Sequence, residues 1–207
     1  GKVYSRQEME ALAGMLEERG RDLGRFPYLV CDEPYRDIVY DGKEVVAVFP
    51  LYRSSVVVSS FAKNLSLPGE RLGYIAVNPA CPDAEELVAA CTFTTRILGF
   101  VNAPAFFQRV VARSWDVPVD YGSYLHRRNL LMEVLDGAGI GYFRPEGAFY
   151  LFCQVPEPGG AVAALLAGTE DSLDMAFCDH LKKYRVLCAP GFGFGCAGWF
   201  RMAYCTS

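Results

Sequence analysis

The sequence has little net charge, few histidines and no long apolar run. Lys and Arg number 20 against 24 Asp and Glu, so the formal net charge is −4 and predicts no nucleic-acid or anionic-membrane partner. No stretch reaches the roughly 18 apolar residues that a membrane-spanning helix needs. No charged and then apolar leader opens the chain. We therefore expect a soluble protein.

Cysteine is present, but not in the patterns of a metal site. None of the eight cysteines belongs to a CxxC motif, and neither of the two histidines stands at metal-ligand spacing from them. Because 52% of the residues are hydrophobic, we expect most of these thiols to be buried and reduced. This favours a cytoplasmic protein without a metal site over disulfides or metal ligands.

The chain is long enough for a sizeable core. Its 207 residues suggest one large domain or two small ones. The hydrophobic fraction is typical of a globular protein and not of a disordered one.

One lysine follows a short apolar run in a chemically informative way. The run Val56 to Val58 predicts a strand, and Lys63 comes just after it in the stretch SSFAKNLSLPGERLGY. Ser60 lies three residues before this lysine and Arg71 eight residues after it. Folded together, these residues offer an amine for a carbonyl group and two hydrogen-bond donors for a phosphate.

An acidic residue ends another predicted strand. The segment from Tyr28 to Cys31 reads as a short buried strand, and Asp32 follows it directly. Ligand groups collect at strand ends in open α/β sheets, so this carboxylate is well placed for a site. Tyr35 lies three residues further on. The alternative is an ordinary strand-to-turn junction, in which Asp and Pro serve the turn.

These motifs, in this order, resemble the lysine motif of the class I/II, fold-type I pyridoxal-phosphate enzymes, the aspartate aminotransferase-like group. The resemblance implies a pyridoxal 5'-phosphate cofactor held by Lys63 as the Schiff base lysine. Asp32 would keep the cofactor's ring nitrogen protonated, and Tyr35 would donate to its phenolic oxygen. Ser60 and Arg71 would bind the phosphate, Arg71 through its planar fork.

Two further residues gain a role from the same resemblance. Near the end of the chain, two short predicted strands flank a glycine-rich connection, and Arg201 lies in the second strand. The corresponding arginine of the family pairs with the substrate's α-carboxylate. The alternative is an exposed strand arginine. Asn102 lies in a turn that in the family reaches towards a neighbouring subunit, although an ordinary helix-start Asn explains it equally well.

The resemblance covers nearly the whole chain and implies the C-terminal half of such an enzyme. Residues 1–122 would be the later part of a large α/β domain with a mixed, mostly parallel sheet. Residues 123–207 would be a small α+β domain whose last helix is missing. Gly1 would end an active-site turn, so the phosphate loop, the ring that stacks on the cofactor and an Asn would lie upstream.

The remaining elements follow from apolar periodicity and capping signals. Helices are predicted from a Ser5 cap to Gly20, from Pro82 to Leu98, from Pro104 to Ser114, from Val119 to Asp136 and from Ser172 to Tyr184. Tyr184 is expected to face inward. Further strands are predicted at Leu72 to Val77 and in GAFYLFCQV, with a loop in VPEPGG.

The predicted function is transfer of an amino group between an amino acid and a 2-oxo acid by a homodimeric enzyme. The given chain would be inactive alone. One alternative is β-elimination from a sulfur amino acid on the same cofactor. The other is a non-catalytic module that binds only its missing half or a second subunit.

Overall fold

The computed structural model describes residues 1–115, 117, 120–157 and 171–205. The chain forms two compact units, one of Val3–Val119 and one of Gly1–Lys2 with Asp120–Ser207. We expected a boundary between residues 122 and 123. The assignment of the units as parts of a large and a small domain stays a prediction.

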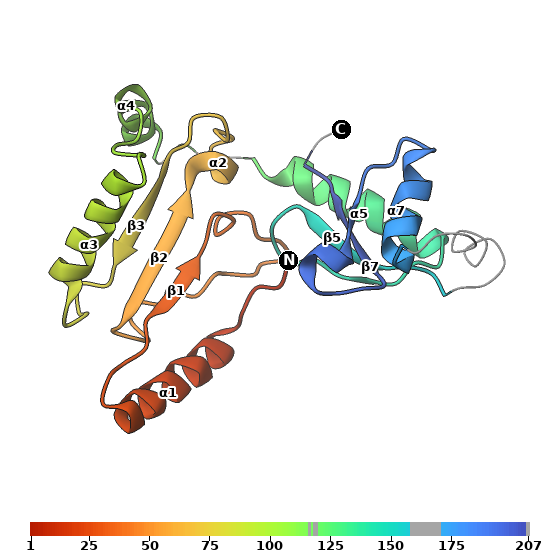
Figure 1. Cartoon of the computed structure of the whole chain (residues 1–207). Helices are drawn as coiled ribbons and strands as arrows, with labels where there is room; N and C mark the ends of the chain where they lie inside the picture. Colours follow the sequence, from red (N-terminus) through yellow and green to blue (C-terminus); the bar gives the residue numbers. More distant parts are fainter. Residues whose placement is uncertain (116, 118–119, 158–170, 206–207) are drawn as a thin grey trace. The chain divides into compact units, whose positions relative to one another are not determined.

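The first unit is built on a three-stranded mixed sheet. Its strands are β1 (Leu29–Asp32), β2 (Ser55–Ser60) and β3 (Gly73–Val77), in the spatial order β1-β2-β3. β1 runs parallel to β2, and β3 runs antiparallel to it. Figure 1 shows β1 and β2 pointing the same way, with α2 directly after the tip of β2. A mixed sheet is the arrangement expected for this part of the chain.

β1 is less buried than its sequence indicated. Along this strand half-buried residues alternate with exposed ones, and the side chain of Val30 is 57% exposed. The prediction of a buried strand was therefore wrong, because successive side chains point to opposite faces and one face of β1 is left open to solvent. Ser55 and Val56 of β2 are buried, whereas Ile75 of β3 is 50% exposed.

Four helices accompany this sheet: α1 (Arg6–Leu23), α2 (Phe61–Asn64), α3 (Ala84–Ile97) and α4 (Ala105–Ser114). The predicted capping box of α1 is confirmed, since the Ser5 side chain accepts from the Glu8 N–H and the Glu8 side chain accepts from the Ser5 N–H. The predicted end at Gly20 was wrong. Gly20 is buried inside the helix, where a Cβ would lie 2.3 Å from the Phe26 ring. The helix ends instead before Gly24, whose φ of +67° is left-handed.

The second unit contains a four-stranded antiparallel sheet. Its strands are β4 (Tyr142–Phe143), β5 (Tyr150–Gln154), β6 (Ala189–Pro190) and β7 (Trp199–Ala203), in the spatial order β4-β5-β7-β6. Among its described residues, the helical elements are α5 (Gly122–Gly137), α7 (Leu173–Lys182) and the 3-10 turn η1 (Gly191–Phe194). Leu151, Cys153 and Phe200 are at most 1% exposed, so the centre of one face of this sheet is covered. Phe177 of α7 packs on Phe200, with ring centroids 5.3 Å apart.

Two helices of this unit differ from their predicted bounds. α5 begins at Gly122, later than the expected Val119, which lies outside the described residues. α7 ends at Lys182, and Tyr184 is 69% exposed, so the expectation that it faces inward was wrong. Tyr184 lies beyond the end of the helix, and the left-handed φ of +64° at Arg185 turns the chain away directly after it. Of the predicted loop VPEPGG, residues 158–160 lie outside the described residues.

The eight cysteines are free thiols, but the expectation that most of them are buried was wrong. Three of them, Cys81, Cys153 and Cys178, are buried, whereas Cys196 is exposed. Burial raises the pKa of the Cys153 thiol to about 12. Among the described helices, none combines the length and the apolar character that crossing a membrane requires.

Candidate active site

Asp32 is the last residue of β1 and lies where β1 and β2 end side by side. In the parallel ladder it stands opposite Val58 of β2, and the pairing continues for one more bond, from the Glu33 N–H to the Val58 carbonyl at 2.8 Å. The Asp32 side chain is exposed. A short strand with a paired neighbour thus fixes the backbone of this residue at the carboxyl edge of the sheet.

Ser60 and Lys63 stand at the same edge, at the end of the neighbouring strand. Ser60 is the last residue of β2 and the N-cap of the short helix α2, where its hydroxyl oxygen accepts the Ala62 N–H at 3.0 Å. Lys63 lies in this helix and is half-buried. Because the cap fixes the first turn of α2, it also fixes the position from which the lysine projects.

Arg71 returns to this edge through a loop that is anchored at both ends. The Phe61 N–H donates to the Leu72 carbonyl at 3.1 Å, and the Leu67 N–H donates to the Phe61 carbonyl at 3.3 Å. Phe61 and Leu72 are also buried in one apolar cluster. Arg71 itself has a left-handed φ of +53°, and its guanidinium donates to the Pro68 carbonyl at 3.0 Å. Its side chain is exposed.

Tyr35 completes the group from the β1 side. The Lys63 Nζ lies 5.6 Å from the centroid of the Tyr35 ring. The two residues follow different strands, and they meet because those strands are parallel neighbours. The structure therefore brings the five candidate cofactor residues to one edge of the sheet. They are Asp32, Tyr35, Ser60, Lys63 and Arg71.

The donor set at this edge fits pyridoxal phosphate. A half-buried amine, a hydroxyl and a guanidinium are the groups that an aldehyde and a phosphate require. A carboxylate ends the neighbouring strand β1, and a phenol lies in the turn after it. Among the described residues, no group of three or more His, Cys, Asp or Glu side chains is arranged to hold a metal ion. The five candidate residues are suited to bind an organic phosphate that carries a reactive carbonyl.

Arg201 belongs to the second unit, on β7. It stands opposite Phe152 of β5 and Ala189 of β6, and is half-buried. Its Cζ lies 4.4 Å from the centroids of both the Tyr150 and the Phe194 rings. Two aromatic rings against one guanidinium restrict its rotation and leave its planar edge for an anion.

A buried acid that the sequence analysis did not select supports this region. The Asp174 side chain is 0% exposed, and its carboxylate accepts the N–H of Phe192 at 2.7 Å and of Gly198 at 3.3 Å. Burial by itself would raise the pKa of Asp174, but hydrogen bonds, that of the Phe192 N–H first among them, bring it below its usual value. The only local signal was an acid in the first turn of a helix, which many helices have.

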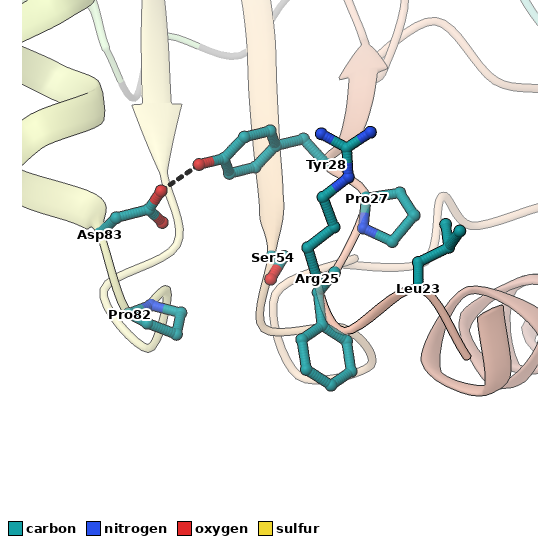
Figure 2. Close-up of a pocket in the computed structure, with 8 residues that line it drawn as sticks. Leu23, Arg25, Pro27, Tyr28, Ser54, Pro82 and Asp83 are labelled. Carbon is teal, nitrogen blue, oxygen red and sulfur yellow. Dashed lines mark hydrogen bonds between the residues drawn. The ribbon is translucent and has the colours of Figure 1, made fainter. Parts of the chain in front are cut away.

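A pocket of about 640 Å³ lies away from this group of residues, where β1 and β2 begin and β3 has ended. Figure 2 shows Tyr28 donating across it to Asp83. This hydrogen bond raises the pKa of Tyr28 to about 12 and lowers that of Asp83. Because Lys63 stands at the opposite ends of the same strands, the pocket is not part of the candidate active site.

Asn102 lies in the exposed bend between α3 and α4, and its interface role stays a prediction.

Known proteins resemble this chain along its whole length. An aspartate aminotransferase from Thermotoga maritima is 26% identical over 210 residues, which span 100% of this chain and 49% of that protein. An aspartate/prephenate aminotransferase from Nitrosomonas europaea is 30% identical over 216 residues, which span 100% of this chain and 52% of that protein. The chain thus spans about half the length of these relatives.

Solved structures agree in fold. The crystal structure of an aminotransferase from Eubacterium rectale superimposes with a TM-score of 0.86 at 39% identity, over 100% of this chain and 48% of that one. A variant of the Thermus thermophilus aspartate aminotransferase gives a TM-score of 0.73 at 26% identity, over 100% and 52%. The family model described as aminotransferase class I and II matches residues 1–207. This chain therefore belongs to the class I and II aminotransferases, and its mixed α/β sheet is part of their fold-type I architecture.

Proposed function

We propose that the protein containing this chain is a pyridoxal-phosphate-dependent aminotransferase that moves an amino group between an amino acid and a 2-oxo acid. The observation that carries the proposal is the meeting of Lys63, Tyr35 and Asp32 at the shared end of two parallel strands. Family membership supports the same reaction class. A homodimer in the cytoplasm, with Asn102 at the subunit interface, belongs to this proposal.

Three residues hold the cofactor in place under this proposal. Lys63 binds its aldehyde carbon through the side-chain amine. Arg71 pairs its planar fork with two phosphate oxygens. The Ser60 oxygen already accepts the Ala62 N–H, and the hydroxyl hydrogen is left to donate to the phosphate.

Two more residues act on the aromatic ring of the cofactor. The Asp32 carboxylate keeps the ring nitrogen protonated, and the Tyr35 hydroxyl donates to the phenolic oxygen. When bound, the cofactor supplies a sink for the electrons that are left at the substrate's Cα.

The substrate is handled by two residues. Arg201 pairs with the α-carboxylate and so orients the amino acid. Lys63, once its amine is released, takes the proton from the substrate's Cα and returns a proton to the cofactor's C4′. The first product is a 2-oxo acid, and a second 2-oxo acid then receives the amino group.

The first experiment identifies the lysine. The complete protein with bound cofactor is reduced with borohydride, digested and mapped by mass spectrometry. We expect the reduced cofactor on Lys63. Reduced cofactor on Lys43 or Lys182 instead, both of which lie outside the candidate site, would overturn the assignment.

The second experiment separates the reaction classes. The complete protein is incubated with a panel of amino acids and 2-oxoglutarate, and products are quantified. Amination of 2-oxoglutarate with a matching 2-oxo acid product supports the proposal. Release of a thiol from a sulfur amino acid, without amination of 2-oxoglutarate, would identify a β-eliminating lyase instead.

The isolated 207-residue chain provides a third test. We propose that it shows no steady-state turnover, because the upstream half of a family member contributes the phosphate loop and the ring that stacks on the cofactor. The chain is assayed after mass spectrometry has shown that no upstream half co-purifies. Turnover by this chain would show that the essential residues all lie within it.

A further inference from the structure

The loop between β6 and β7 is held from outside by one buried carboxylate. Asp174 in the first turn of α7 accepts the N–H of Phe192 at 2.7 Å and the N–H of Gly198 at 3.3 Å. Phe192 lies near the start of this loop, and Gly198 is the residue directly before β7. One side chain therefore fixes both ends of the loop.

The loop is rich in glycine, and backbone hydrogen bonds also hold its turn, from the Gly195 N–H to the Phe192 carbonyl at 3.0 Å and from the Cys196 N–H to the Gly191 carbonyl at 2.9 Å. Gly195 and Gly198 have left-handed φ angles of +71° and +79°. A Cβ at Gly191 would lie 2.2 Å from the Cys196 carbonyl oxygen, so the backbone packs directly on itself there. A glycine-rich loop has high conformational entropy when it is free. Hydrogen bonds from its backbone N–H groups to a buried acceptor are a direct means of ordering this loop.

The loop also carries the ring that contacts Arg201. Phe194 lies between the two anchored positions, and its ring centroid is 4.4 Å from the Arg201 Cζ. The same ring meets Phe152 edge-on, with centroids 6.3 Å apart. A change in the loop backbone would move this ring away from the guanidinium.

We propose that Asp174 is a positioning residue for Arg201: by binding both ends of the loop, it holds the Phe194 ring against the guanidinium and so fixes the direction of its planar fork. The expected effect on substrate binding rests on the proposed function, in which Arg201 binds the α-carboxylate. The effect of Asp174 on the position of the Arg201 side chain is independent of that function.

A carboxylate suits this task better than an amide. Both oxygens of Asp174 are used as acceptors, one for each N–H. An asparagine side chain at this position has nearly the same shape, but its amide nitrogen would face an N–H and leave that donor unsatisfied. Asp174→Asn is therefore a conservative change that breaks one end of the anchor.

The first test reads the position of Arg201 without any cofactor or activity. The side-chain Nε–Hε resonance of Arg201 is recorded by NMR in the complete protein and assigned with Arg201→Lys. We expect Asp174→Asn to shift this resonance in the same direction as Phe194→Leu does, because both remove the ring current of Phe194. A resonance that stays at the parent position in Asp174→Asn would overturn the proposal.

Two control variants separate this effect from general damage. Asp179→Asn is the same substitution on the same helix, at an exposed carboxylate that pairs with Lys182. Met132→Ala removes a buried side chain of α5 in the same unit. Neither should shift the Arg201 resonance, although Met132→Ala should lower the thermal midpoint. If Asp174→Asn does not fold, Asp174→Ser keeps one oxygen acceptor and is expected to shift the resonance in the same direction.

The second test measures the consequence for substrate. Asp174→Asn and Phe194→Leu should each raise KM for the amino acid roughly 2- to 30-fold, the range of a lost cation–π contact, with a smaller effect on kcat. The KM of the double variant should be no higher than that of the more impaired single variant, because both changes act through the same ring. The proposal would be contradicted if the fold-increases in KM of the two single variants multiplied in the double variant. A fall in kcat at unchanged KM would also contradict it.

The outcomes distinguish this inference from the proposed function. If Arg201→Lys leaves KM for amino acids unchanged, the carboxylate role of Arg201 fails, and the NMR comparison still decides whether Asp174 positions it. If Arg201→Lys raises KM while Asp174→Asn changes neither KM nor the resonance, the proposed function stands and the positioning role is wrong.

Discussion

The two sheets of this protein differ in how completely they are covered. In the four-stranded sheet, Leu151 and Phe200 are 0% and 1% exposed. Phe177 of α7 packs on Phe200. In the three-stranded sheet, Val30 and Ile75 are 57% and 50% exposed. The candidate cofactor residues all lie on or next to the more open, three-stranded sheet of the first unit. The candidate site of the first unit therefore lies at strand ends, whereas the second unit is organised around buried side chains of its sheet.

Exposed apolar side chains in the first unit point to further packing. Several of the largest lie on or next to α3, and they are Phe93, Ile97, Leu98 and Phe100. Patches of this kind on a soluble protein mark surfaces that bind other protein. We expect the isolated chain to self-associate through exposed apolar side chains such as these.

The largest expected effect comes from the lysine of the open sheet. Lys63→Ala in the complete protein should lower turnover roughly 10²- to 10⁴-fold, which is the usual range for loss of a general acid-base group. It should also abolish the borohydride-reducible adduct. The circular dichroism spectrum should not change, because Lys63 is not part of a core. Lys43→Ala, a lysine of the same unit outside the site, is the control, and equal losses in both variants would refute the assignment.

The second effect concerns the acid at the neighbouring strand end. Asp32→Asn should retain bound cofactor but lower turnover on the order of 10²- to 10³-fold, as is typical when one electrostatic partner is removed from a transition state. Single-turnover transamination followed by absorbance measures the chemical step directly. A variant that runs at the parent rate would show that Asp32 serves only the turn.

A third prediction tests the difference in coverage between the two sheets. Leu151→Ala should lower the free energy of unfolding of its unit by roughly 2–5 kcal/mol, because it leaves a cavity in a closed core. Ile75→Ala should cost less than about 1 kcal/mol, since half of its side chain is in solvent. Urea unfolding of both variants, each followed by a probe in its own unit, measures the two costs. Equal costs would mean that the first sheet is covered in solution.

The fourth prediction contrasts the arginines of the two sheets. Arg71→Lys should weaken cofactor retention about 10-fold and leave KM for amino acids nearly unchanged, because a point charge replaces a two-pronged donor. Arg201→Lys should do the opposite. Titrations of each variant with cofactor and with substrate separate the two effects. Interchanged results would show that the phosphate and carboxylate sites have been swapped.

The smallest expected effect is the pH dependence of the closed unit. The folded pKa of Asp174 is lowered, so its carboxylate contributes stability that is full above its unfolded pKa of about 3.9. This contribution is lost as pH falls from there through the lower folded pKa. Thermal midpoints measured between about pH 5 and 2 should fall less steeply in Asp174→Asn than in the parent. Parallel curves would show that another carboxylate governs this range.

Several features were predictable from the sequence because they depend on local chemistry. Ser5 and Glu8 lie within one helical turn, so their capping box needs no other part of the chain. Lys63 and Asp32 each follow a short apolar run, and the strand-end rule places both at one edge once the strands are known to be parallel. The roles of these residues came from the family resemblance and not from spacing alone.

Other features could not be read locally. Gly20 looked like a helix end, but it serves as the contact point for Phe26, and Gly24 ends the helix. Tyr184 continued the apolar pattern of α7, yet it follows the end of that helix and is exposed. In each case a contact or a backbone turn outside the local pattern decided the outcome.

The sequence by itself determined which candidate groups are present and the order in which they follow strands, because side-chain type and period are properties of short segments. Only the tertiary structure decided which of them meet. The parallel pairing of β1 and β2 brings Tyr35 within 5.6 Å of the Lys63 amine. The Asp174 hydrogen bonds join residues 18 and 24 positions apart. Such contacts depend on how the chain folds back on itself, and no local pattern encodes them.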